Sequence, residues 1–354
     1  MKQLNTLIII LVTNLFFSTI KAQDTTLTNT LNFKQLKPIV QIFGTASYDT
    51  ENKRYDYNFG RAHLGLQYQY NERWSAKIII DRGRATSVGE ISITDSTGHT
   101  LDIQNSSKEG SYYTMFLKFA SLQWKVNDRL SLEAGAILQN HYITQERFWG
   151  LRYVAQTFQD LYWKIPSSDL GFIAFYNVNK AISLDASITN GEGVRVQQDA
   201  TGKVKFAGGL NINPTSILQS RFYYHNRQAS DEKLNTEHMY AAFIGLRPSS
   251  KLRVGSEFNY MKHLNYSGMD SYGYSIYSSY QLTDKTAYFI RFDRLLNDTK
   301  HTENTNTQGD GNSIMGGIAH APVKKINISL NYQGWISDHH NNQNNILLSM
   351  EYKF

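Results

Sequence analysis

The sequence lacks the residues on which several protein classes depend. It contains no cysteine, which excludes disulfides and thiolate metal ligands. It has only 5 prolines, and beyond Phe17 no apolar run is long enough to cross a bilayer as a helix. A formal net charge of +6 is too small to indicate a nucleic-acid partner. A disulfide scaffold, a bundle of membrane helices and a nucleic-acid-binding protein are therefore all disfavoured.

The N-terminus has the pattern of an export signal. Lys2 precedes an apolar run over residues 7–17, and Ala22 offers a small residue for cleavage, although Ile20 fits the small-residue rule poorly. We predict a signal peptide over residues 1–22, removed after Ala22, and a lead-in of low periodicity over residues 23–36. The mature protein is then exported.

From residue 37 to residue 354 the sequence alternates between apolar and polar residues. Ile182, Leu184, Ala186 and Ile188, for example, alternate with serine, aspartate and threonine, the period of a strand with two different faces. We predict an all-β domain of about sixteen antiparallel strands at residues 38–48, 55–70, 74–82, 112–126, 130–139, 170–178, 181–189, 203–212, 217–227, 237–247, 252–263, 270–282, 286–296, 313–321, 326–336 and 345–354.

The connections between these strands alternate between short polar turns and longer loops. Residues 71–73 and 127–129 are short, whereas residues 83–111 and 140–169 are long. An even number of strands with this asymmetry is typical of a transmembrane β-barrel with lipid outside and water inside. The 23 tyrosines and 18 phenylalanines also favour such a barrel, because many aromatic residues lie near predicted strand ends, where they would form girdles at the two membrane interfaces. Ordinary strand propensity explains the same enrichment.

If the apolar side faces lipid, the other side faces a lumen that carries more basic than acidic residues. The basic residues predicted to face inward are Arg61, Lys77, Lys118, Lys203, Lys205, Arg221, Arg227, Arg253 and Arg291. An excess of positive charge would concentrate anions in the pore. The alternative is that these charges pair with the fewer acidic residues and only keep the lumen wet.

Three stretches carry a resemblance to a known family. They are the terminal strand NILLSMEYKF (residues 345–354), the segment ERFWGLRY (residues 146–153) and RAHLGLQYQYNERWSAKIIID (residues 61–81). Together with the export signal they resemble Bacteroidota outer-membrane porins related to the phosphate-selective porin O and P family. The resemblance implies passive diffusion of small hydrophilic solutes, with a mild preference for anions such as phosphate. It also implies partners in outer-membrane lipids and in the barrel-assembly machinery, which reads the terminal phenylalanine.

The third long loop, residues 140–169, is unusually aromatic for an exposed segment. Residues 145–161 can form a short amphipathic helix broken at Gly150. In the sixteen-stranded porins that the chain resembles, the third loop folds into the barrel and narrows the pore. That resemblance predicts a pore constriction formed by Glu146, Arg147, Trp149, Arg152, Tyr153 and Asp160. The alternative is a lid or a contact between protomers.

Other function classes find little support. His339 and His340 follow Asp338 in an asparagine-rich loop, the pattern of polar loop residues more than of a metal or catalytic site. An outer-membrane lipase or protease, or a closed structural barrel, remains the alternative to a porin. We expect no enzyme activity, no cofactor and no metal. A homotrimer and a monomer are not distinguished, because lipid-facing and partner-facing strands have the same pattern.

Overall fold

The computed structural model describes residues 33–84, 93, 94, 100, 101, 113–196, 202–298 and 309–354. The predicted signal peptide and the lead-in up to residue 32 lie outside the described residues. The chain divides into two compact units, Met1–Lys34 and Gln35–Phe354, and the second contains the barrel and the candidate site.

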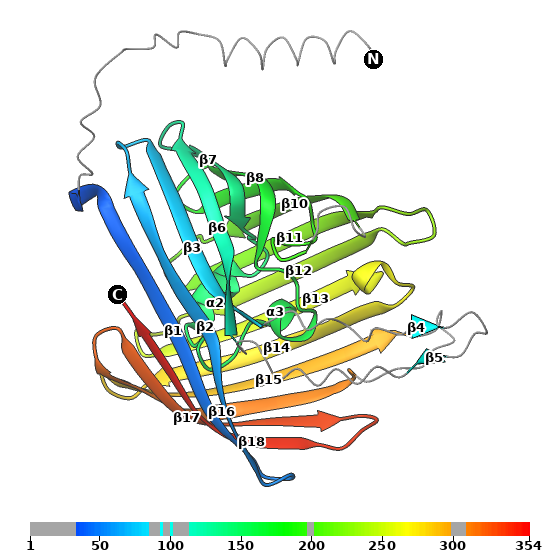
Figure 1. The fold of residues 1–354 in the computed structure, drawn as a ribbon. Coiled ribbons are helices and arrows are strands. Elements are labelled where there is room, and N and C mark those ends of the chain that lie inside the picture. Colours follow the sequence, from blue (N-terminus) through cyan, green and yellow to red (C-terminus); the bar gives the residue numbers. More distant parts are fainter. Residues whose placement is uncertain (1–32, 85–92, 95–99, 102–112, 197–201, 299–308) are drawn as a thin grey trace, which may run out of the picture. The chain divides into compact units, whose positions relative to one another are not determined.

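The second unit is a closed antiparallel β-barrel of sixteen strands in which each strand pairs with its neighbours in sequence (Figure 1). Its strands are β1 (Leu36–Asp49), β2 (Arg54–Gln69), β3 (Trp74–Arg84), β6 (Tyr113–Lys125), β7 (Leu130–Leu138), β8 (Ser168–Asn177), β9 (Ile182–Thr189), β10 (Gly202–Ile212), β11 (Leu218–Ala229), β12 (Glu237–Leu246), β13 (Leu252–Lys262), β14 (Asp270–Gln281), β15 (Thr286–Asp298), β16 (Gly311–Val323), β17 (Ile326–Ser337) and β18 (Gln343–Lys353). The predicted all-β barrel is confirmed, and every predicted strand ends within two residues of the observed one.

The first and last strands close the barrel. β1 pairs with β18 in register from Gln41 with Lys353 to Asp49 with Asn345. Beyond β18, the backbones of Val40 and Phe354 exchange two hydrogen bonds of 3.2 and 3.1 Å. The strand predicted at the C-terminus therefore takes part in the ladder up to the last residue.

Small elements complete the described part of the chain. A two-stranded hairpin, β4 (Ile93–Thr94) with β5 (Thr100–Leu101), lies in the loop after β3 and was not predicted. The short helices are η1 (Phe33–Gln35), α2 (Ile143–Trp149), α3 (Phe158–Tyr162) and η2 (Leu264–Tyr266). None of the described helices is long and apolar enough to span a bilayer.

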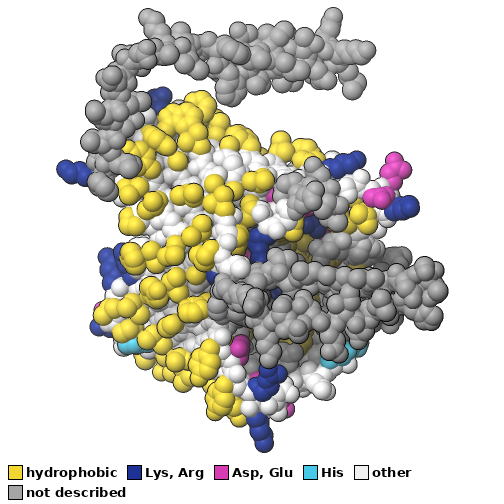
Figure 2. Space-filling model, viewed as in Figure 1, with side chains coloured by type: hydrophobic (Ala, Val, Ile, Leu, Met, Phe, Trp, Pro, Cys, Tyr) yellow, Lys and Arg dark blue, Asp and Glu magenta, His cyan; other side chains and the backbone are white. Residues whose placement is uncertain are grey.

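The two faces of the barrel strands differ as the alternation predicts. On β15 and β17, the outward Ile290 and Leu330 are each 60% exposed, whereas the adjacent Arg291 and Asn331 are 1% and 3% exposed. Figure 2 shows hydrophobic side chains spread over the strands on the side in view. The barrel therefore has an apolar outer surface, and its inner surface carries the polar side chains together with buried aromatic ones.

Six of the short turns share one pattern of side-chain hydrogen bonds. In the turns after β2, β6 and β8, the side-chain oxygen of Asn71, Asn127 or Asn179 accepts from the backbone N–H groups two and three residues later, at 2.8–3.0 Å. Thr215, Ser249 and Thr283 use a hydroxyl in the same way in three further turns. Such a side chain replaces water for the turn's backbone donors and brings the next strand into register.

We therefore expect Asn127→Ala to destabilise the barrel by about 1 kcal/mol, because two backbone donors lose their acceptor at a solvent-exposed turn. The measurement is the urea midpoint of the folded barrel in detergent. Asn127→Asp keeps the acceptor oxygen and is expected to unfold like the wild type. Equal losses in the two variants would show that the oxygen is not responsible.

Candidate functional site

The candidate site lies where the third loop, residues 139–167 between β7 and β8, enters the barrel. Its first helix, α2, ends at Gly150, which adopts a left-handed conformation (φ 72°) and donates its N–H to the carbonyl of Glu146 at 2.9 Å. Glycine reaches this conformation without strain. A turn over residues 151–155 leads to α3, which has only 5 residues. The predicted break at Gly150 is confirmed, but the continuous helix expected beyond it is replaced by this turn and a short second helix.

Aromatic side chains pack the loop against the inner wall. Phe148 meets Phe243 of β12 with ring centroids 5.3 Å apart, and Trp149 meets Tyr277 of β14 and Phe289 of β15 at 5.0 and 5.8 Å. At the other end of the loop, Phe158 belongs to a second buried cluster with side chains of β11, β12 and β13. Both helices therefore lie inside the ring of strands (Figure 1).

Side chains of the wall bind the backbone of the loop. Arg221 donates to the carbonyl of Asn140 at 2.8 Å, Arg253 to that of Phe148 at 3.2 Å and Arg291 to that of Gln156 at 2.6 Å. Gln333 donates to the carbonyl of Val154 at 3.0 Å. Irregular backbone inside a barrel leaves carbonyls without partners, so these donors replace water and hold the loop in place.

A cavity of about 600 Å³ remains between the loop and the wall formed by β2, β3 and β6. The described basic residues that line it are Arg61, Arg82, Lys118, Arg152, Lys164 and Arg195, and the acidic ones are Asp81, Asp160 and Glu192. Six basic residues face three acidic ones, so the cavity has an excess of positive formal charge.

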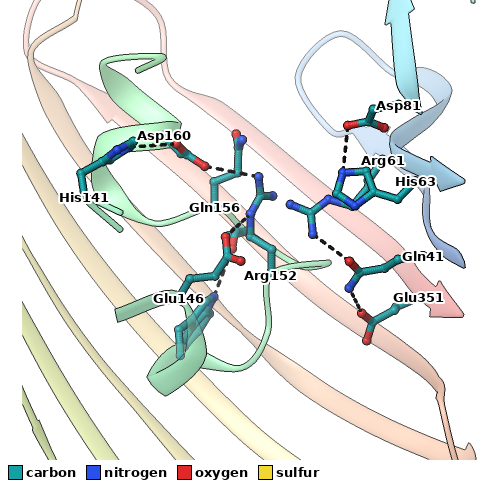
Figure 3. Close-up of polar contacts among 12 residues, drawn as sticks. Gln41, Arg61, His63, Asp81, His141, Glu146, Arg152, Gln156, Asp160 and Glu351 are labelled. Carbon is teal, nitrogen blue, oxygen red and sulfur yellow. Dashed lines mark hydrogen bonds and ion pairs between the residues drawn. The ribbon is translucent and has the colours of Figure 1, made fainter. Parts of the chain in front are cut away.

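On the loop side of the cavity, Arg152 joins two carboxylates. Its Nε donates to Glu146 Oε2 at 2.7 Å and its Nη2 to Asp160 Oδ2 at 3.4 Å. His141 Nε2 lies 3.6 Å from the other oxygen of Asp160. Figure 3 shows the guanidinium of Arg152 between the two acids and turned toward the guanidinium of Arg61 on the wall.

On the wall side, Asp81 is the shared acceptor. Lys118 Nζ and His63 Nε2 lie 2.7 and 3.1 Å from Asp81 Oδ2, while the other oxygen accepts the backbone N–H groups of Ala62 and Arg82. Arg61 donates instead to Gln41 Oε1 at 3.0 Å. The wall therefore presents two cations to the cavity, Arg61 and Lys118, and only Lys118 is paired with the carboxylate of Asp81.

Burial and neighbouring charges set the protonation of the loop groups. Burial lowers the pKa of His141, against the opposing effect of Asp160. Burial alone would raise the pKa of Asp160, but the contact with His141 and the charge of Arg152 together hold it below its ordinary value. At neutral pH His141 is then neutral and Asp160 ionised, so in this cluster one cation, Arg152, lies between two anions.

The residues predicted to form the constriction fall into three groups. Arg152 and Asp160 line the cavity, and Glu146 pairs with Arg152. Trp149 and Tyr153 are buried in the apolar cluster that attaches the loop to the wall. Arg147 is exposed on α2 and does not line the cavity. The family resemblance also implies that Arg147 and Arg152 lie opposite Glu146 or Asp160. In the structure Arg152 instead lies with both acids, and Arg61 and Lys118 face them.

The predicted lumen-facing basic residues also divide by role. Arg61 and Lys118 line the cavity, whereas Arg221, Arg253 and Arg291 bind the loop. The remaining members are paired or placed elsewhere: Lys77 binds Glu133, Arg227 binds Glu237, buried Lys205 donates to Gln139, and Lys203 is exposed. A register shift between Gly202 and Lys205 interrupts the alternation from which the inward position of Lys203 was expected.

Sequence reasoning did not single out several residues at the cavity. Arg82, Lys164, Glu192 and Arg195 line it but belong to strand ends or loops, where alternation assigns no face. Gly191 and Gly193 donate their N–H groups to Asp169 at 2.7 and 3.1 Å. That contact directs the segment with Glu192 and Arg195 over the cavity. The two glycines that flank Glu192 were the only feature of the sequence that pointed to this contact.

In the predicted polar loop after β17, the described groups form hydrogen bonds with other parts of the chain. Asp338 forms a two-bond contact with Arg294 at 2.6 and 2.9 Å, while the backbone N–H groups of His339 and His340 donate to Ser337. Among the described residues, no three histidine or acidic side chains are grouped as a metal ion would require.

Comparisons with known proteins identify the fold. No family model matches the chain, and no curated protein matches its sequence. Solved structures do match, and each match covers 90% of this chain. The outer membrane channel DcaP of Acinetobacter baumannii is 12% identical, with a TM-score of 0.59 over 97% of its own chain. The anion-selective porin from Comamonas acidovorans is 9% identical (TM-score 0.61, 99% of its chain), and OmpT of Vibrio cholerae in a trimer form is 11% identical (TM-score 0.55, 99% of its chain). The chain therefore has the fold of outer-membrane porins.

Removing a wall anchor should loosen the loop. Arg291 is fully buried, its Nε donates to Asp293 at 2.8 Å, and it also binds the loop carbonyl of Gln156. We expect Arg291→Met to destabilise the barrel by about 3–5 kcal/mol, because the carboxylate of Asp293 is left buried without its cation.

The measurement is the urea midpoint, together with protease cleavage within residues 139–167. Arg294→Met is the matched control, since its contact with Asp338 is partly exposed and contributes about 1 kcal/mol or less. Similar losses in the two variants, or an uncleaved loop in Arg291→Met, would contradict the anchoring role.

Proposed function

We propose that the protein is an outer-membrane porin that lets small hydrophilic solutes diffuse passively, with a mild preference for anions such as phosphate. The observation that carries the proposal is a water-accessible, predominantly basic cavity inside a closed barrel whose outer surface is apolar. The fold shared with DcaP and with the anion-selective porin supports it.

The outer surface supports a position in a bilayer. Large apolar side chains such as Ile276, Ile290 and Leu348 are each at least half exposed on barrel strands, which would be unfavourable in water. A closed barrel is one of the two structures that satisfy every backbone group in hydrocarbon. Outer-membrane lipids and the barrel-assembly machinery are then partners of the exported chain, with the predicted signal peptide as its export signal.

Selection would occur by pore width and by charge. The third loop fills the lumen beside β11 to β17, so a solute passes between the loop and the wall that carries Arg61 and Lys118. Their positive charge raises the local concentration of anions, and the acids of the loop on the opposite side create a transverse field. No bond is made or broken, and no cofactor takes part.

The protein is further proposed to form a homotrimer. OmpT of Vibrio cholerae, which has the same fold, has been solved in a trimer form. An apolar depression of about 490 Å³ lies on the outer surface at β1, β2, β17 and β18, with Gly44 and Ala46 between Tyr57, Phe59 and Met350. Small residues beside large ones suit close packing against a second copy. The mass of the protein in mild detergent tests this proposal, and a monomeric mass would contradict it.

The porin proposal predicts ion conduction limited by the third loop. In planar bilayers the refolded mature protein should give stable conductance steps with an anion-selective reversal potential under a salt gradient. Replacing residues 145–162 by a short glycine-serine linker should raise the conductance roughly twofold or more, because the lumen widens where ions pass.

Heat-modifiable migration on gels checks that both forms are folded. A folded wild type without conductance would contradict the porin and favour a structural barrel, or an enzyme if the deletion abolishes hydrolysis of lipid or peptide substrates. Stable steps with cation preference would retain the channel and contradict the anion preference.

A further inference from the structure

Arg61 differs in its contact partner from most of the other inward basic residues, and the other two that have no carboxylate partner, Lys205 and Arg253, do not line the cavity. Lys77, Lys118, Arg152, Arg221, Arg227 and Arg291 each have a carboxylate oxygen within 3.2 Å. No carboxylate of the described residues lies within ion-pair distance of Arg61, whose Nη1 donates to the neutral amide oxygen of Gln41 at 3.0 Å. A charge paired at contact distance attracts a passing ion only weakly, because the partner's field opposes its own. The charge of Arg61 is therefore available to the cavity that it lines.

Gln41 stands between Arg61 and a carboxylate. Its Oε1 accepts from Arg61, and its Nε2 donates to Glu351 Oε1 at 2.6 Å, so the two partners determine which end of the amide faces which group (Figure 3). The other oxygen of Glu351 accepts from Asn327 at 2.6 Å and lies 3.3 Å from Lys353 Nζ. The carboxylate of Glu351 is thus bound by donors other than Arg61, and the side chain of Gln41 separates it from Arg61.

The backbone and an aromatic ring also fix Arg61. Between β1 and β2 the register shifts so that Phe43 faces Arg61 and Gly44 faces Phe59, which leaves Gly60 as the additional residue of a bulge. Bulges redirect neighbouring side chains. The guanidinium carbon of Arg61 lies 4.7 Å from the centre of the Phe43 ring, a cation–π contact. Arg61 is therefore oriented by a ring and an amide, neither of which carries negative charge.

We propose that Gln41 is a specificity-determining position of the channel, because its neutral amide orients Arg61 while keeping a carboxylate out of contact with it. The proposal rests on the porin function proposed above. Gln41 touches no solute; it acts through Arg61, and so is a positioning residue. Its neutrality, together with the excess of basic residues that line the cavity, sets the preference for anions.

The test exchanges the two side chains. In the double variant Gln41→Glu with Glu351→Gln, the composition and net charge are unchanged and every hydrogen bond of the chain from Arg61 to Asn327 can still form. The carboxylate, however, now contacts Arg61 directly. We expect the chloride-to-potassium permeability ratio to fall roughly fivefold, as a unit charge at about 4 Å in water would produce, and to match that of Arg61→Gln.

Two controls separate charge from structure. Gln41→Met removes the hydrogen bond but adds no charge, and the Phe43 ring still holds the guanidinium of Arg61, so this variant should keep the anion preference. Exchanging Arg294 and Asp338, a contact outside the cavity, should also leave the permeability ratio unchanged. Heat-modifiable migration and single-channel conductance of each variant show that the barrel has formed.

The outcomes are distinguishable. A wild type that conducts with anion preference, and an exchanged variant that keeps this preference, would overturn the role of Gln41 and leave the porin intact. The role of Gln41 would also be overturned if Gln41→Met lost as much anion preference as the exchanged variant, because the neutrality of position 41 would then not matter. A folded wild type that does not conduct would overturn the porin proposal and this inference with it.

Discussion

The pairing of β1 with β18 is the constraint on which the rest of the structure depends. Every non-proline residue carries a backbone donor and acceptor, and only a closed ladder satisfies all of them without water. The register from Gln41 to Asp49, extended by the two bonds between Val40 and Phe354, supplies the last row of hydrogen bonds. Once the ring is closed, alternation along each strand assigns its side chains to one of two surfaces.

The closed ring creates a second requirement inside. A loop that enters the lumen brings carbonyl groups that no strand can bind, and long wall side chains donate to four of them. Arg221, Arg253 and Arg291 therefore serve the loop. Two of the three are also paired with Asp185 or Asp293, so they add little free charge to the cavity. The structure thus uses much of its inward basic charge to hold the loop.

The sequence predicted the barrel far better than it predicted the site. Alternation and asparagine-containing turns located all sixteen strands, because both signals depend on residues close together in the chain. The contacts of the site depend on residues far apart: Gln41 binds Glu351, 310 positions away, and Arg291 binds the loop at Gln156. A pattern of period two places Arg61 and Arg291 on the same surface but does not reveal that one lines the cavity and the other anchors the loop. Bulges, such as those at Gly60 and before Lys205, also change locally which surface of the barrel a side chain faces, and the alternation does not show where they occur.

Closure and the chemistry of the cavity depend on the same register. Phe43 of β1 is the ladder partner of Glu351 of β18, and Gln41, two residues earlier, reaches across that seam to the carboxylate. A shift of one residue between the two strands would turn Glu351 to the outer surface, remove the acceptor that orients Gln41 and leave a carboxylate among apolar side chains. Arg61 can therefore take its observed orientation only after the first and last strands have joined in the correct register. The step that completes the backbone ladder is also the step that completes the wall opposite the loop.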